Sequence, residues 1–217
     1  ALTSDRFKDE TKQVYSLGGI SAQWRKDHKT KEADWGVDLK YDYFQDKFKT
    51  AEHLFYLNGE YSSPVDWLDV DDQSIGFKIN SQTFQTQFDF SGFFPSMDTT
   101  VGYFHGLYEL APYFQLQQGD FKLVAGVKFG MALDSNSAVG LAPMVKADFT
   151  MLDEQLGLYI LADGGFRNNS MSSLTTENSF ISPIVPLKYT NTKYHLQLGA
   201  KGHVANYIDY HIYGEMS

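Results

Sequence analysis

Segments of about ten residues in which apolar and polar residues alternate recur along most of this chain. In residues 33–43, ADWGVDLKYDY, the odd positions are all apolar or aromatic, and the even positions hold three Asp, one Lys and one Gly. Because successive side chains of a β-strand point to opposite faces, such a segment has one apolar face and one charged face. A strand of about 9 to 11 residues crosses a bilayer at a tilt. The pattern therefore predicts the wall of a transmembrane β-barrel.

The same alternation divides the chain into roughly twelve predicted strands. Further examples start near Phe55, Ile75, Phe84, Phe121, Leu141, Tyr194 and Ile208, and the weakest one starts near Leu156. Short turn sequences at 118–120 and 152–155 favour hairpins and hence an antiparallel meander. We expect one all-β domain over residues 1–217, which closes into a transmembrane β-barrel or forms part of a larger one.

Connections of uneven length fit a barrel with short turns at one rim and longer loops at the other. Longer polar connections are expected at 26–32, 63–73 and 134–137. Residues 168–190 contain Pro183 and Pro186 and are expected to be irregular.

Composition supports an envelope barrel over several other classes. Mean hydropathy is slightly polar, −0.35, although 16% of the residues are aromatic, as expected where residues facing a lumen offset residues facing lipid. There is no apolar run of about 18 residues, which disfavours a helical membrane protein. The chain has no Cys, so a disulfide framework, a thiolate metal site and a cysteine nucleophile are excluded. The net charge of −9 disfavours nucleic acid as a partner.

Aromatic residues often lie toward the ends of the predicted strands, as Tyr41, Tyr43, Phe121 and Phe129 do. Tyr and Trp prefer the interface between lipid and water, where the ring is buried and the polar tip stays wet. Aromatic residues also favour strands in soluble proteins, so ordinary sheet packing is the alternative.

Two segments near the end of the chain resemble a family. The stretch 177–183, ENSFISP, and the strand 194–202, YHLQLGAKG, are similar to a segment of TonB-dependent-receptor-like outer-membrane barrels from Bacteroidetes. Ser179 and Ile184 stand where the family pattern has Pro and Glu. The resemblance implies an outer-membrane barrel with a role in uptake, although no plug domain or energy-coupling box is recognisable.

The two ends of the sequence suggest a piece of a longer protein. The chain begins at Ala1 with neither an initiator Met nor a leader, which predicts a processed or excised chain. It ends at Ser217 without the terminal aromatic residue that the resemblance implies as an assembly signal. We therefore expect a barrel fragment.

The charged faces of the predicted strands supply the candidate functional residues. The lumen-lining candidates are Asp34, Asp38, Lys40, Asp42, Glu60, Lys78, Asp89, Lys122, Lys128, Lys146, Asp148, Asp163, Lys201 and Asp209. In a narrow barrel these groups would pair across strands and fill the lumen, and in a wider one they would line a wet channel and bias its selectivity. Both interpretations remain open.

Other clusters give weaker hypotheses. Asp66, Asp69, Asp71 and Asp72 could collect Ca²⁺, but their spacing lacks the Gly and distal Glu of a calcium loop, so a solvated acidic turn is favoured. The basic cluster Lys26, Lys29 and Lys31 is interleaved with acidic residues and is interpreted as a solvated turn.

Histidines near the end of the chain do not indicate catalysis. His195, His203 and His211 fall on or beside the last two predicted strands, without a spacing that sets up a nucleophile, a base and an orienting acid. We expect no catalytic residue, no metal site and no cofactor, and hence a protein that is not an enzyme.

The combined prediction is a barrel in a bacterial outer membrane. Its partners would be membrane lipid and a small polar solute. The barrel would pass this solute passively or take it up with the help of a receptor, or it would be a structural component of the envelope. The rim loops 63–73 and 168–190 would take part. The alternative is a soluble barrel or curved sheet whose apolar face turns inward to bind a hydrophobic ligand, because that fold has the same periodicity. Partition into detergent distinguishes the two.

Overall fold

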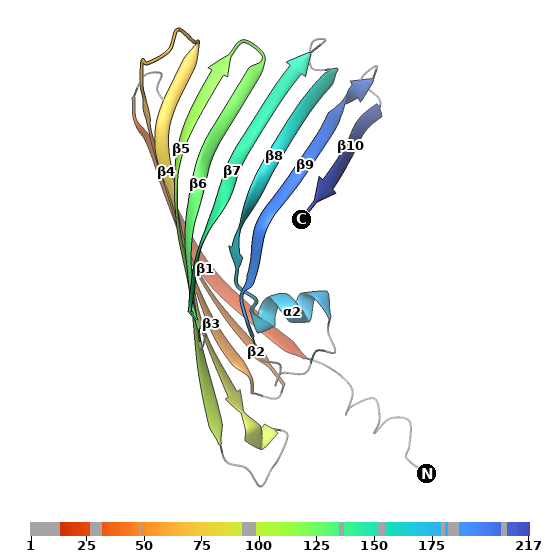
Figure 1. Ribbon diagram of the computed structural model, residues 1–217. Coiled ribbons are helices and arrows are strands. Elements are labelled where there is room, and N and C mark those ends of the chain that lie inside the picture. Colours follow the sequence, from red (N-terminus) through yellow and green to blue (C-terminus); the bar gives the residue numbers. More distant parts are fainter. Residues whose placement is uncertain are drawn as a thin grey trace.

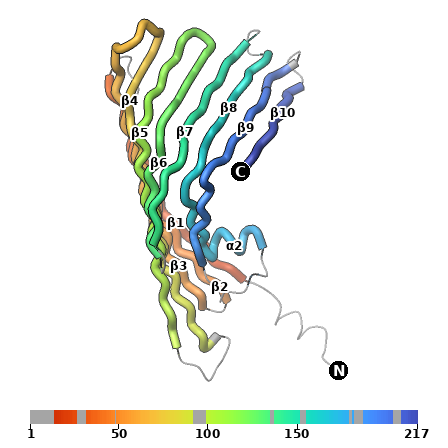
Figure 2. Tube along the Cα trace, in the orientation of Figure 1, coloured from red at the N-terminus to blue at the C-terminus, as the bar shows by residue number. Residues whose placement is uncertain are grey.

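A computed structural model describes residues 14–26, 32–47, 49–92, 99–134, 137–151, 155–178, 181, 187–204 and 208–217. These residues form one antiparallel sheet of ten strands in chain order (Figures 1 and 2). The strands are β1 (Tyr15–Arg25), β2 (Asp34–Asp46), β3 (Ala51–Pro64), β4 (Asp72–Asp89), β5 (Thr100–Gln118), β6 (Phe121–Leu133), β7 (Ala138–Met151), β8 (Leu156–Arg167), β9 (Thr190–Val204) and β10 (Ile208–Met216).

The all-β antiparallel meander is confirmed, and closure into a barrel is not. The described residues form ten strands, which is within two of the roughly twelve predicted. β1 and β10 are the two edges of the sheet and are not paired with each other, so the described sheet is open. Two short helices accompany it, η1 (Phe90–Gly92) and α2 (Met171–Glu177). Neither has the length and apolar character of a membrane-spanning helix, among the residues described.

Each strand has an apolar and a polar side, and the pairing aligns these sides across the sheet. Residues directly opposite each other in an antiparallel pair share a face. Ala22 pairs with Leu39, which pairs with Leu57, on what we call the apolar face. Glu60 pairs with Lys78 on the other side, the polar face. The period-2 pattern of the sequence thus becomes two continuous surfaces.

The polar face is the concave one. The sheet curves around α2 in Figure 1, and α2 packs against side chains of the polar face. The apolar face is convex and exposed: Leu39 and Val127 retain 41% and 42% of their accessible surface. A structure with these residues packed in an interior would have matched the soluble alternative, and the described sheet has the opposite arrangement.

Strand β4 changes which of its sides is apolar partway along. Ile75, Phe77 and Ile79 lie on the apolar face, whereas Phe84 and Phe88 lie on the polar face and are buried. The change explains why two strands were predicted in this region, since a shift of one residue in an alternating pattern looks like a break. Beyond this point, the convex side of β4 is lined by polar residues.

The buried part of the concave side lies at the same end of the sheet. Phe44 and Phe88 pack with Met171 of α2 and with Leu187 in one cluster. Leu107, Ala132 and Phe166 form a second cluster. The concave side therefore carries buried apolar residues where it holds α2 and the residues that follow β8.

Consecutive strands are strongly staggered. A row of directly paired residues runs from Met216 in β10 through Leu196, Ala162, Val145, Ala125, Phe114 and Ile75 to Ser63 in β3. Arg25, the last residue of β1, does not reach this row. Its partner Gly36 pairs with Glu60, which precedes Ser63 on β3. Counted along these rows, β10 thus lies beyond the end of β1. Strands that tilt around a barrel axis require such a stagger.

Candidate functional site

The polar face brings together nearly all of the predicted lumen-lining residues. Those on it are Asp34, Asp38, Lys40, Asp42, Glu60, Lys78, Lys122, Lys128, Lys146, Asp148, Asp163, Lys201 and Asp209. They come from eight of the ten strands, β2 to β4 and β6 to β10. None comes from β5, which the sequence pattern did not identify.

Asp89 is the exception among the candidates. It ends β4 opposite Thr100, on the side of the strand that carries Gln85 and Gln87. Its carboxylate accepts hydrogen bonds from Ser91 and lies 3.4 Å from the Lys49 ammonium. Asp89 was placed with the lumen candidates because it alternates with phenylalanines, but in this part of β4 the phenylalanines are the residues that face the concave side.

Opposite charges on the polar face are paired. Asp38 accepts from Arg25 at 3.0 Å, Asp42 lies 2.6 Å from the Lys40 ammonium, and Glu60 lies 3.3 Å from that of Lys78. Farther along the sheet, Asp148 lies between Lys146 at 3.2 Å and Lys201 at 3.7 Å. The cation of each pair is about half exposed, and such partly exposed pairs contribute roughly 0 to 1 kcal/mol each. They neutralise the face rather than hold the fold together.

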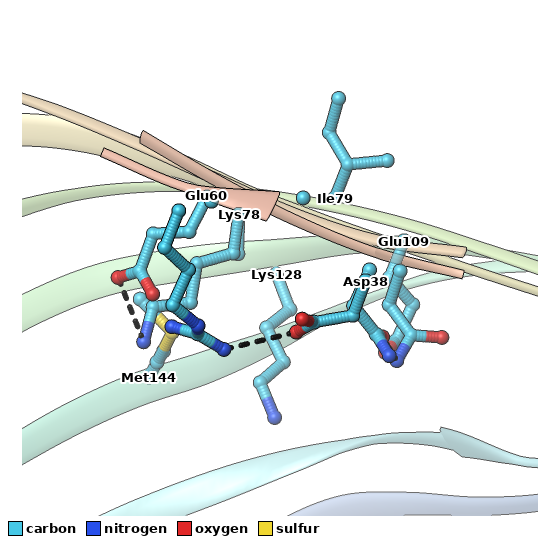
Figure 3. A pocket seen from close by; sticks show the side chains of 13 residues that line it. Asp38, Glu60, Lys78, Ile79, Glu109, Lys128 and Met144 are labelled. Atoms are coloured by element: carbon cyan, nitrogen blue, oxygen red, sulfur yellow. Dashed lines mark hydrogen bonds and ion pairs between the residues drawn. The ribbon is translucent and has the colours of Figure 1, made fainter. Parts of the chain in front are cut away.

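A polar cavity of about 260 Å³ lies on the concave side and reaches from β1 to β7. Two neighbouring rows of paired residues line it. One row contains Arg25, Glu60 and Lys78, with Lys128 beyond Ala111, and the next contains Asp38, Asn58, Asn80 and Glu109. Figure 3 shows Glu60 and Lys78 on one side of the cavity and Asp38 and Glu109 on the other, while Ile79 points away from it.

Small residues between the charged ones give the cavity its room. Gly36 and Ala111 separate the charged members of the first row. The Arg25 side chain lies across Gly36, where an added Cβ would come within 3.5 Å of it, and so reaches Asp38. The Asn58 and Asn80 amides are joined by a hydrogen bond of 2.9 Å at the centre of the second row.

A bulge in β8 fixes one wall of the cavity. The pairing of β8 with β9 shifts register between Asp163 and Gly165, and Gly165 has a φ of +120°, which favours Gly. Lys128 is bonded to the Asp163 carboxylate and donates to the Gly164 carbonyl at 3.1 Å. An added Cβ at Gly165 would lie 2.7 Å from the Glu109 carboxylate. The bulge therefore holds Lys128 and leaves space for Glu109.

Several members of this site were missed as site residues in the sequence. Glu109 and Tyr113 lie in β5, and Tyr113 donates to Glu60 at 2.9 Å. Arg25 ends β1, whose alternation is ambiguous in phase. Asn58 and Asn80 alternate with apolar residues and so could have been found, had uncharged polar residues been included with the charged ones.

The acidic segment between β3 and β4 has a structural role. The Asp71 carboxylate accepts from the Gly119 N–H at 2.6 Å, and the Asp71 N–H donates to Gln118 at 3.1 Å. This segment is therefore tied to the β5–β6 turn, in which Gly119 has a φ of +53°. The described residues include no group of His, Asp and Glu side chains suited to hold a metal ion.

The three histidines singled out in the sequence lie on β9 and β10. His211 is bonded to the Tyr159 hydroxyl at 2.6 Å, and His195 lies 3.5 Å from the Glu215 carboxylate. His203 pairs with Asp209 across the two strands. These contacts bring each histidine next to a separate partner on the polar face.

Comparison of the chain with models of known families and with curated proteins finds no match.

Proposed function

We propose that this chain forms the wall, or part of the wall, of a β-barrel in a bacterial outer membrane, and that its concave polar face lines a route for a small polar solute. The resemblance of residues 177–183 and 194–202 to TonB-dependent-receptor-like barrels agrees with this location. The apolar face would contact lipid, and the rim loops would meet the solute first.

The observation that carries the proposal is the absence of charge on the convex side. Apart from Asp89 at the end of β4 and Arg167 at the end of β8, the outward positions of the described strands hold no Asp, Glu, Lys or Arg. Exposed apolar residues cover this side, among them Ile20, Phe55, Leu110, Phe129, Leu141, Ile160, Leu198 and Ile212. Soluble proteins rarely expose an apolar patch larger than a few hundred Å². A hydrocarbon surrounding explains a surface of this extent.

Aromatic residues at the borders of the apolar face support the same surroundings. Trp35 stands at one end of its outward run on β2, and Tyr41 and Tyr43 stand at the other. On β3, Phe55 and Tyr61 occupy the corresponding ends, and Tyr61 stacks on Phe77 at 5.6 Å. Amphipathic rings at both ends of an apolar band are typical of the two membrane interfaces.

The change of pattern in β4 gives the band a border. Outward positions after Ile79 are Ser81, Thr83, Gln85 and Gln87, which would meet water or headgroups. This part of the β4–β5 hairpin projects beyond the neighbouring strands in Figure 1. Among the inward residues at the same level, Phe88 packs with Met171 of α2, and the Thr86 hydroxyl donates to Glu52. In this proposal one strand has both a part that faces the membrane and a part that projects beyond it.

Flotation with lipid vesicles tests the proposal. The folded chain should rise with the vesicles, and vesicles that contain it should swell in an isotonic solution of a small polar solute but not of a large polymer. A variant with Leu39→Asp and Val127→Asp on the apolar face should stay in the aqueous fraction. The control with Gln85→Asp and Gln87→Asp, on the same side beyond the apolar band, should float. A wild-type chain that remains monomeric in plain buffer without vesicles would contradict the proposal.

A further inference from the structure

The polar cavity separates its charges into two parallel rows. The first row carries the cations Arg25, Lys78 and Lys128, and its one carboxylate, Glu60, is occupied by Tyr113 at 2.9 Å and by Lys78 at 3.3 Å. The neighbouring row carries the carboxylates Asp38 and Glu109 and no cation within the cavity. The Arg25 guanidinium reaches across to the Asp38 carboxylate at 3.0 Å, so the two rows are joined at that end. The charges that stay on separate rows are Lys78 and Lys128 on the first and Glu109 on the second.

The two rows lie a fixed distance apart. Residues that face the same side of a strand and follow each other are two positions apart, as Lys78 and Asn80 are, and this corresponds to about 7 Å along the strand. A ligand that meets both rows must carry its own opposite charges at a similar spacing. An extended dipeptide spans about 7 Å between its ends.

The groups that line the rows have capacity left for a ligand. The Arg25 guanidinium has five N–H donors, and Asp38 accepts from one of its nitrogens. The Lys78 ammonium has three donors, and its side chain keeps 48% of its accessible surface. Bound carboxylate would add charge-assisted hydrogen bonds to these donors without breaking the ion pairs that hold them.

We infer that this cavity binds a small zwitterion of dipeptide length, with its carboxylate toward Lys78 and Lys128 and its ammonium toward Glu109. The Asn58 and Asn80 amides lie beside Glu109 on the second row, where they would exchange hydrogen bonds with the part of the ligand next to its ammonium. A ligand with a single charge would meet an opposite charge on one row only. The charged groups of the other row would then have no oppositely charged group on the ligand. This inference rests on the proposed function, because it names the class of solute for the route.

Calorimetry on the chain in detergent micelles tests the inference, with glycylglycine as the probe. Glycylglycine should bind, and N-acetylglycylglycine, glycylglycine amide and glucose should bind at least roughly tenfold more weakly, since each lacks a charge that one row would meet. Lys78→Gln should weaken glycylglycine binding by a similar factor. The control Lys146→Gln removes an equally exposed, ion-paired lysine of the polar face outside the cavity, and should leave binding unchanged.

Equal binding of glycylglycine and its acetylated form would overturn the inference, as would equal effects of the two lysine substitutions or the absence of glycylglycine binding. Vesicle flotation separates this failure from failure of the proposed function. A chain that floats but does not bind the dipeptide is still a membrane barrel, whereas a chain that does not float removes the proposed function whatever its cavity binds.

Discussion

The carboxylate of Glu52 accepts a hydrogen bond from the backbone N–H of Met171 at 3.0 Å, across 119 residues of sequence. The same carboxylate accepts from Ser172 N–H at 3.1 Å and from the Thr86 hydroxyl at 3.0 Å, and Glu52 is fully buried. A carboxylate on β3 thus binds the first turn of α2 and fixes this helix on the concave side of the sheet.

Removal of the Glu52 carboxylate should destabilise the chain. Glu52→Ala leaves two backbone N–H groups and one hydroxyl without their acceptor, and we expect a loss of roughly 2 to 4 kcal/mol in the free energy of unfolding. Urea titration of the folded chain in micelles measures it. Glu32→Ala, which removes an exposed carboxylate 2.9 Å from the Lys26 ammonium, should change the value by less than about 0.5 kcal/mol. Similar losses in both variants would contradict the role of Glu52.

A methyl group at Gly199 should clash with a neighbouring ring. An added Cβ would lie 2.5 Å from the Tyr159 ring, which covers this glycine from the paired strand. We expect Gly199→Ala to cost about 1 to 3 kcal/mol through overpacking. Gly214→Ala on the adjacent strand has nothing within 4 Å of the added Cβ and is the control. In a Tyr159→Ala background the cost of Gly199→Ala should largely disappear, and an unchanged cost there would show that the ring is not its cause.

Two outward positions of β4 should respond differently to a lysine. Ile79 lies within the apolar band and Gln85 lies beyond its border, although both are on the convex side. In vesicles, Ile79→Lys should cost roughly 2 to 4 kcal/mol, the range for a cation near the middle of a bilayer. Gln85→Lys should cost little. Unfolding by urea from vesicles compares them, and equally small effects at both sites would place Ile79 in water.

The strands with strict alternation were predictable from the sequence. The prediction for residues 33–43 corresponds to β2, and those that start near Phe121 and Leu141 correspond to β6 and β7. In these segments one side of the strand is apolar and charged residues recur on the other, so the period alone gives the strand and its faces. The turn at Gly119 was also predicted, because Gly suits the positive φ found there.

Strand β5 was not identified because both of its sides are apolar over part of its length. Leu107 faces the concave side and is fully buried beside Phe166, while Leu110 faces the convex side. Pro112 further obscured the pattern, since Pro is rare within sheets. The inward side of β5 is apolar because of a long-range contact. An alternation of period 2 in the sequence cannot reveal which residues α2 and the end of β8 will cover.

The arrangement of the candidate site could be predicted only in part. The polar face followed from alternation. The two charge rows depend on the register between six strands, which brings Arg25, Lys78 and Lys128 from distant parts of the sequence into one row. Helix α2 was expected only as irregular chain. Its position depends on Glu52, whose partner is not visible in any local pattern.

The central claim is that the convex side of the sheet contacts hydrocarbon and the concave side contacts water. The chain has no Cys, so a single cysteine can carry an environment-sensitive fluorophore at Leu39 or at Lys40, adjacent positions on opposite faces of β2 that are both exposed in the structure. In lipid vesicles, the label at position 39 should emit at shorter wavelength and resist quenching by aqueous iodide, and the label at position 40 should be quenched. Equal quenching at both positions would contradict the claim.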